Sequence, residues 1–226
     1  MKTLTVRLLT FFCLMAQTLL VRAADHPRIY VDRVPAIRAA LADPSSHHGL
    51  VIADMKKAVA NPDASAAYEE HIEAYTLSYR AREAAFLCLI AENPAEKKKY
   101  AEIAYDLVKN DYNGAERKAY DGYGLSRAMM SVGLGLTYDW CYEQWTPKQR
   151  AAIKKQIDRA LDAWPKYGHA NLRGHRGSNW AAVCFGGELI LILGAGEETA
   201  RADRVKRLKR NLKQHMKTAY GDIGYS

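Results

Sequence analysis

The sequence predicts an all-α protein, specifically an incomplete (α/α) toroid of stacked helical hairpins. Apolar residues recur at helical spacing, and no segment shows the alternation typical of a strand. The segments 125–142 and 179–194 are apolar nearly all round, whereas 94–109, 147–163 and 198–219 carry one apolar stripe. A helix without a polar face needs neighbours on both sides, so we expect an inner ring and an outer ring. An irregular helical bundle is the alternative.

Residues 1–23 have the pattern of a secretory signal peptide. A basic start, MKTLTVR, precedes the apolar run LLTFFCLMAQTLLV, and the sequence VRA predicts cleavage after Ala23. No second long apolar run follows, so a retained signal-anchor helix is the less favoured interpretation. We therefore expect a periplasmic or secreted protein that has no membrane association after cleavage. Residues 24–226 would form the toroid domain.

The first helices are expected over 32–43, 47–60 and 63–93. Asp32 is the expected cap of the first helix, with Pro35 in its first turn. The third is expected to end at Asn93-Pro94, because a residue before proline disfavours helical backbone.

The outer helices carry clear start signals. Asn93 is the expected cap of 94–109, with Pro94 at its first position, and Thr146 and Gln149 predict a capping box before 147–163. The expected inward stripes are Tyr100, Ile103, Ala104, Leu107 and Val108; Ile153, Ile157, Ala160, Leu161 and Trp164; and Val205, Leu208, Leu212 and Met216.

The inner helices contain glycines that we expect to permit close backbone contact, namely Gly133, Gly135, Gly186 and Gly187. Ser178 is the expected cap of 179–194. The inner helices begin about 55 residues apart, longer than common solenoid repeats, which favours a toroid. Because the sequence stops at AYGDIGYS without a closing helix, we expect it to be the N-terminal piece of a longer protein.

The net charge of the chain bears on its partners. Removing residues 1–23 removes three basic residues and no acids, which lowers the formal net charge from +8 to +5. For an exported protein, this charge favours an acidic polysaccharide over nucleic acid.

Three cysteines, Cys88, Cys141 and Cys184, remain after cleavage and are expected to be buried. One disulfide could form, but the sequence does not select the pair. The oligomeric state is left open.

The loops that lead into the inner helices hold the candidate site. In a toroid these loops surround one mouth of the central cavity. The polar and aromatic residues expected there are Tyr112, Tyr120, Tyr123, His169, Arg173, His175, Arg176, Asn179, Trp180 and Tyr225. Aromatic faces stack on sugars, arginine and asparagine bind carboxylates, and histidine or tyrosine moves protons.

This set of residues suits β-elimination at a uronic acid. Asn179 with Arg173 or Arg176 would neutralise the carboxylate, His175 would assist with charge or proton transfer, and no metal or organic cofactor is required. Tyr123, Tyr225, His169 and Trp180 would bind the sugar chain. Each residue also has a structural interpretation: loop histidines are often solvated, and Trp180 can belong to the core.

Carboxylates and the other histidines are given lesser roles. Glu188 is either a site acid or the partner of a buried arginine. We expect His26, His47 and His48 at the surface. A glycoside hydrolase needs two facing carboxylates, and the loops hold few acids, chiefly Asp121 and Asp222, so hydrolysis ranks lower.

Four segments carry a family resemblance: HPRIYVDRVPAIRAAL, GLSRAMMSVGLGLTYDWCYEQWTPKQRAAI, SNWAAVCFGGELILIL and YGDIGYS. Together they resemble the N-terminal toroid domain of heparinase II/III-like polysaccharide lyases. The resemblance covers about His26 to Ser226. It implies an (α/α) toroid followed by a β-sandwich, with an acidic polysaccharide cleaved between them. It also implies a general acid/base tyrosine beyond Ser226.

One departure from the family affects the predicted chemistry. Relatives often carry Asn-Asn-His at the start of this inner helix, where this chain has Ser178-Asn179-Trp180. Asn179 matches, but the histidine does not unless His175 reaches in from the loop. The leading hypothesis is an exported uronate polysaccharide lyase, with these residues alone inactive. The alternatives are a non-catalytic glycan-binding module and a toroid glycoside hydrolase.

Overall fold

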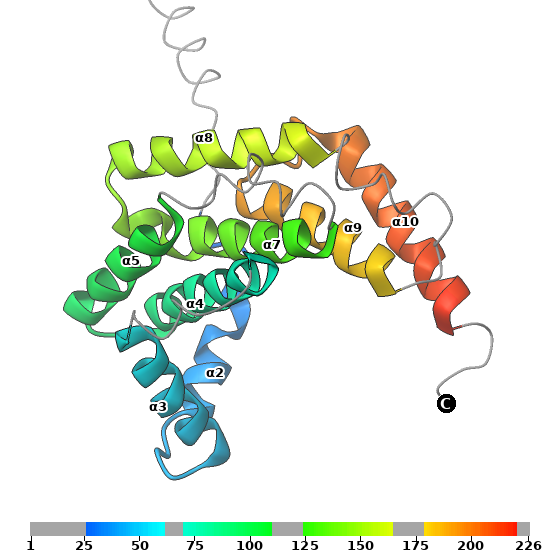
Figure 1. Cartoon of the computed structure of the whole chain (residues 1–226). Helices are drawn as coiled ribbons and strands as arrows, with labels where there is room; N and C mark the ends of the chain where they lie inside the picture. The colour runs from blue at the N-terminus through cyan, green and yellow to red at the C-terminus, as the bar shows by residue number, and fades with distance from the viewer. Residues whose placement is uncertain (1–25, 62–69, 110–123, 165–178, 221–226) are drawn as a thin grey trace, which may run out of the picture.

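The computed structural model describes residues 26–61, 70–109, 124–164 and 179–220, and all regular structure in these ranges is helical (Figure 1). This confirms the all-α prediction for the described residues. The elements are η1 (Val31–Arg33), α2 (Val34–Ala40), α3 (His47–Ala60), α4 (Glu70–Ile90), α5 (Pro94–Val108), α7 (Gly124–Cys141), η3 (Tyr142–Gln144), α8 (Pro147–Ala163), α9 (Asn179–Gly194) and α10 (Ala202–Tyr220).

Three of the described helices form an inner layer, in which α7 packs between α4 and α9. The register shows that they run parallel. Ser78 bonds the carbonyl of Met129, and Cys88 that of Trp140, at separations of 51 and 52 residues. On the other side of α7, Gly187 contacts Ala128 and Gly194 contacts Gly135, and both pairs are 59 positions apart.

The outer layer consists of α5, α8 and α10. Helices α5 and α8 are also parallel to each other, because Gln149 reaches Glu102 and Gln156 reaches the Lys109 carbonyl, each pair being 47 residues apart. Helix α10 packs along α9. Its N-terminal turn meets α8 through the guanidinium of Arg204, which donates to the Leu161 carbonyl at 2.7 Å.

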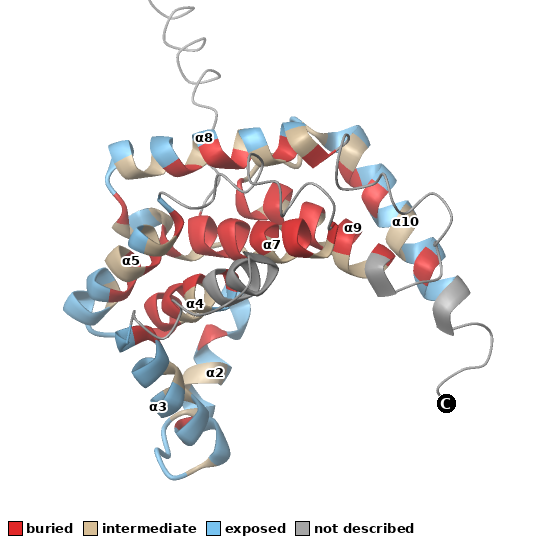
Figure 2. Cartoon of the chain, in the orientation of Figure 1, coloured by how far each residue is buried: buried red, intermediate tan, exposed pale blue. Residues whose placement is uncertain are grey.

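Burial follows the two layers as predicted (Figure 2). Fourteen of the eighteen residues of α7 are buried, whereas α8 buries one stripe, consisting of Ile153, Gln156, Ile157 and Leu161. Short connections join each inner helix to the next outer one, over 91–93, 142–146 and 195–201. The chain therefore repeats an inner-outer hairpin three times within the described residues.

The parallel inner layer has two distinct ends. We call the end where α4, α7 and α9 begin, at Glu70, Gly124 and Asn179, the entry end. The other end, where they finish at Ile90, Cys141 and Gly194, is the turn end.

The predicted start signals of the outer helices are confirmed. The Asn93 side chain accepts from the amides of Ala95 (2.8 Å) and Glu96 (3.3 Å), which caps α5. Thr146 and Gln149 form the expected reciprocal capping box on α8. Pro94 and Pro147 stand in the first turns of these helices.

The prediction for the first helix was wrong in one respect. Asp32 lies in the 3-10 turn η1, and Arg33 precedes α2 without any side-chain cap, although Pro35 is in the first turn as expected. The segment before this turn, residues 26–29, contacts α7, as described below.

The inward stripe of α10 also differs from the prediction. Met216 is 56% exposed, and His215 is buried in its place. Val205, Leu208, Leu212 and His215 follow one another at steps of three and four residues, so His215 continues the buried face and Met216 lies beside it.

Within the described residues, no helix combines the length and apolar composition that crossing a bilayer requires.

Candidate functional site

The site predicted from the sequence lies mostly outside the described residues. Tyr112, Tyr120, Tyr123, His169, Arg173, His175, Arg176 and Tyr225 all fall there. Asn179 and Trp180 form the first turn of α9, and their side chains are not among those described. Ser178, the expected cap, is also outside. What the structure does describe is the scaffold from which these residues extend.

That scaffold brings the starts of the inner helices to one end. Because α4, α7 and α9 are parallel and adjacent, the residues that precede Gly124 and Asn179 are attached to the same end of the inner layer. The ends of the outer helices lie there too. The indole of Trp164, which follows α8, donates to the hydroxyl of Ser131 in the first half of α7 at 3.1 Å.

The electrostatics of the entry end favour an anion. Each inner helix directs the positive end of its dipole there, where the first backbone N–H groups have no partner within the helix. Arg127, in the first turn of α7, adds a guanidinium that is only 4% exposed. The three aligned helix starts therefore direct positive partial charge toward this end.

A second group of charges lies near the middle of α4. Arg82 stacks on the Tyr79 ring at 4.3 Å, and its Nε donates to the Ser78 carbonyl at 3.3 Å. Burial raises the pKa of Glu83 above its usual value, and the nearby charges of Arg80 and Arg82 oppose this shift.

Sequence reasoning missed these residues and Arg127. The sequence did contain a signal for Arg127, because it is a charged residue within a largely apolar helix. A charge at such a position is normally paired or functional.

Glu188, for which two roles were left open, is the partner of a partly buried arginine. Its carboxylate is fully buried on α9 and accepts from Nε of Arg204, whose Nη2 also bonds the Leu161 carbonyl. Burial, together with this negative charge, raises the pKa of Cys184 to about 12. The pair joins α9 to α10 and α8, so Glu188 contributes to the packing of the layers.

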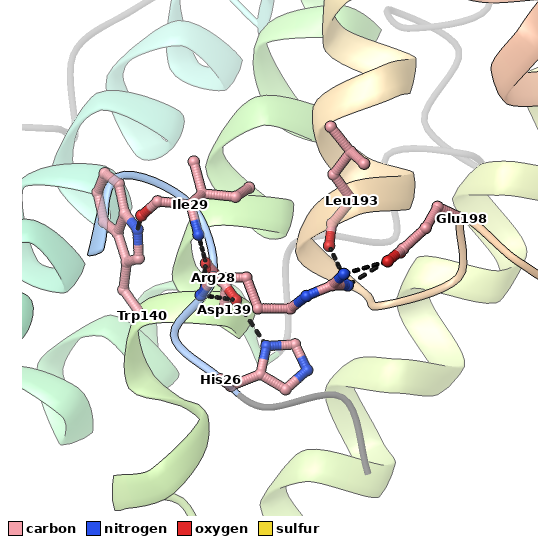
Figure 3. A network of polar contacts seen from close by, with 7 residues as sticks. All are labelled: His26, Arg28, Ile29, Asp139, Trp140, Leu193 and Glu198. Carbon is pink, nitrogen blue, oxygen red and sulfur yellow. Dashed lines mark hydrogen bonds and ion pairs between the residues drawn. The ribbon is translucent and has the colours of Figure 1, made fainter. Parts of the chain in front are cut away.

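The turn end holds a buried polar network that we call the clamp, formed by His26, Arg28, Asp139 and Glu198 (Figure 3). Asp139 is fully buried near the end of α7. Its carboxylate accepts from His26 Nδ1 at 2.6 Å, from the Arg28 amide at 3.0 Å and from the Ile29 amide at 2.8 Å. Three donors therefore satisfy one buried charge.

The clamp extends from α7 to α9 and beyond it. The Arg28 guanidinium donates to the Leu193 carbonyl at 3.4 Å and to Oε2 of Glu198 at 2.9 Å, while Trp140 Nε1 donates to the Ile29 carbonyl at 2.9 Å (Figure 3). Segment 26–29 thus crosses the turn end and holds the inner helices together.

This network corrects the expectation that His26 is a surface residue. Its side chain is 3% exposed and stacks on Tyr142 at 4.2 Å between ring centroids. The expectation failed because the partner, Asp139, is 113 residues away in the sequence. His47 and His48 are exposed, as predicted.

Within residues 26–61, 70–109, 124–164 and 179–220, no group of three or more histidine, cysteine or acidic side chains is placed to hold a metal ion. A scan against models of protein families found no matching family, and a search of curated proteins found no significant relative.

Proposed function

We propose that this chain is the α-toroid domain of an exported lyase that cleaves a uronic-acid-containing polysaccharide by β-elimination. The observation that carries the proposal is the parallel inner layer, whose helix starts share one end. The residues predicted to bind and act on the sugar lie at or just before those starts. The repeated inner-outer hairpins support an arc of an (α/α) toroid.

The proposed chemistry uses the entry end as a carboxylate site. Asn179 and Arg173 or Arg176 bind the uronate carboxylate, and the helix dipoles add positive potential. Stabilising charge on the carboxylate makes the C5 proton more acidic. His175 or a tyrosine removes that proton, the C4–O bond breaks, and the departing oxygen is protonated.

The remaining predicted residues position the sugar chain. Tyr123, Tyr225 and Trp180 offer ring faces on which sugars stack, and His169 offers a hydrogen bond. The family resemblance places the general acid/base tyrosine beyond Ser226. The 226-residue chain therefore tests binding, and a longer chain that includes that tyrosine tests the reaction.

Binding is tested by isothermal titration of the chain with heparin, alginate and polygalacturonate oligosaccharides. Asn179→Ala removes a hydrogen bond to a charged group, so the Kd should rise about tenfold. The matched control is Asn61→Ala, an exposed asparagine at the end of α3, which should leave the Kd unchanged. Equal affinity of all three proteins would exclude Asn179 from the site.

The reaction is tested by the ultraviolet absorbance of unsaturated uronide products. The longer chain should form them, the 226-residue chain should not, and Asn179→Ala in the longer chain should lower the rate at least about a hundredfold. Salt-sensitive binding without product would support the non-catalytic glycan-binding module instead. New reducing ends without absorbance would support a hydrolase.

A further inference from the structure

Helices α4 and α7 approach each other closely along their whole contact. On α4, the residues facing this contact are small: Ala81, Ala84 and Ala85 are fully buried, and Cys88 is 1% exposed. Hydroxyl and thiol groups of α4 reach backbone carbonyls of α7, as at Ser78 and Cys88. A short side chain touches a neighbouring backbone only when the two helices lie near one another.

Two thiols meet in this contact at the turn end. The Cys88 sulfur lies 3.8 Å from the carbonyl oxygen of Trp140, and the next residue along α7 is Cys141. Cys141 is fully buried, and its thiol is close enough to that of Cys88 to lower the pKa of Cys88. Cys184 belongs to a different helix, α9, where its charged neighbour is Glu188.

We propose that Cys88 and Cys141 form an intramolecular disulfide when the chain meets a thiol–disulfide oxidant, and that Cys184 stays a thiol. A disulfide needs Cα atoms within about 7 Å, and Cys88 contacts the residue that directly precedes Cys141, whereas Cys184 lies on α9. The sequence left the pair unselected, and the structure selects it by proximity. This inference does not depend on the proposed lyase activity.

Oxidation of the pair proceeds by two successive thiol–disulfide exchanges. A Cys88 thiolate attacks the disulfide of the oxidant and forms a mixed disulfide, which releases one thiol. The Cys141 thiolate then attacks the Cys88 sulfur and releases the second thiol. The protein loses two electrons and two protons, and the oxidant is reduced to two thiols.

The surroundings make Cys88 the first sulfur to react. The hydrogen bond from Cys141 lowers the pKa of Cys88, against the effect of burial, and Lys97 lowers it further. Burial raises the pKa of Cys141. A pocket of about 270 Å³, lined by Cys88, Lys97 and Trp140 among others, leads from the surface to Cys88.

The bond would stabilise the helix that carries the clamp. Cys141 lies two residues beyond Asp139, which holds segment 26–29. A covalent link from α4 to this end of α7 would fix both helices at the turn end and leave the entry end unchanged.

Peptide mapping tests the pairing on the unmodified sequence. The reduced, unfolded chain is refolded in a glutathione redox buffer, free thiols are alkylated, and the protein is digested with trypsin. The four cysteines fall on separate tryptic peptides, 8–22, 83–97, 128–148 and 177–201. We expect 83–97 linked to 128–148 and 177–201 alkylated. Recovery of 83–97 and 128–148 as alkylated peptides, or a link to 177–201, would overturn the proposal.

The melting temperature provides a second test that does not depend on peptide mapping. The oxidised chain should melt roughly 10 °C above the reduced chain, because the bond closes a long loop. Cys184→Ser should keep this difference and Cys88→Ser should abolish it. An oxidised protein that carries the expected link but melts below the reduced form would show that the folded helices do not accommodate the bond.

Discussion

Asp139 is a fully buried carboxyl group in a largely apolar helix, and its neighbours explain how the fold tolerates it. A buried carboxylate is costly unless donors replace the water it loses. Here the donors are His26 and the amides of Arg28 and Ile29, all from the first described residues of the chain. The N-terminal segment and the charge therefore depend on each other.

Replacing Asp139 with asparagine should destabilise the protein substantially. The variant keeps the shape but loses the charge that holds three donors, so the free energy of unfolding should fall by about 2–4 kcal/mol. Urea unfolding followed by circular dichroism measures this. The control is Asp54→Asn, whose side chain is 79% exposed and pairs only with Lys57 among the described contacts; it should change stability by less than about 0.5 kcal/mol. Equal losses of stability in the two variants would show that the clamp does not stabilise the fold.

Glu198 should make part of the stability dependent on pH. The hydrogen bond from Arg28 lowers the pKa of Glu198 below its ordinary value of 4.5, against the effect of burial. A carboxyl with a lowered folded pKa stabilises the protein above the unfolded value, and this contribution is lost as the pH falls through the folded value. Unfolding free energies measured from pH 6 down to pH 3 should therefore fall less steeply in Glu198→Gln. The exposed Glu92→Gln serves as the control and should retain the slope of the parent chain.

Two adjacent glycines on α9 lie in opposite surroundings. An added Cβ on Gly187 would come within 2.7 Å of the Ala128 carbonyl oxygen on α7, whereas one on Gly186 would meet none of the described residues within 4 Å. The sequence predicted a close approach at both positions, which is confirmed for Gly187 and wrong for Gly186. At Gly135 the prediction is also confirmed, since its Cβ would lie 2.9 Å from the Ile190 carbonyl oxygen.

Alanine at these two positions should act in opposite directions. Gly186→Ala should raise the free energy of unfolding by about 0.5–1 kcal/mol, because alanine favours the helix. Gly187→Ala should lower it by about 1–3 kcal/mol, because α7 and α9 must move apart. Chemical unfolding of the pair, with each variant serving as the other's control, measures this. A destabilising Gly186→Ala would mean that something occupies the space beside it.

The helices could be predicted where their signals are local. Asn93, Thr146 and the adjacent prolines mark helix starts within four residues, and the structure confirms them. The predictions for Asp32 and Met216 were wrong. Asp32 lies in a 3-10 turn before α2 rather than at its cap, and on α10 it is His215 that packs inward while Met216 is exposed.

The division of the described helices into two layers could also be predicted. A helix that is apolar on all sides must be covered on all sides, whichever helices are its neighbours. The register could not be predicted. It depends on pairs such as Ser78 with Met129 or His26 with Asp139, which lie 51 and 113 residues apart and have no spacing signal. The parallel register is nevertheless what gives the inner layer a common entry end, which is the location proposed for the predicted site residues.

The most direct test of that location is a hydrogen-exchange footprint of the chain with and without an anionic oligouronate. Slower exchange should be confined to peptides that cover the entry end, within 110–127 and 165–182. Peptides of the turn end, within 89–97 and 139–147, should exchange at unchanged rates and provide the internal control. Protection at the turn end alone, or nowhere at saturating ligand, would contradict the account.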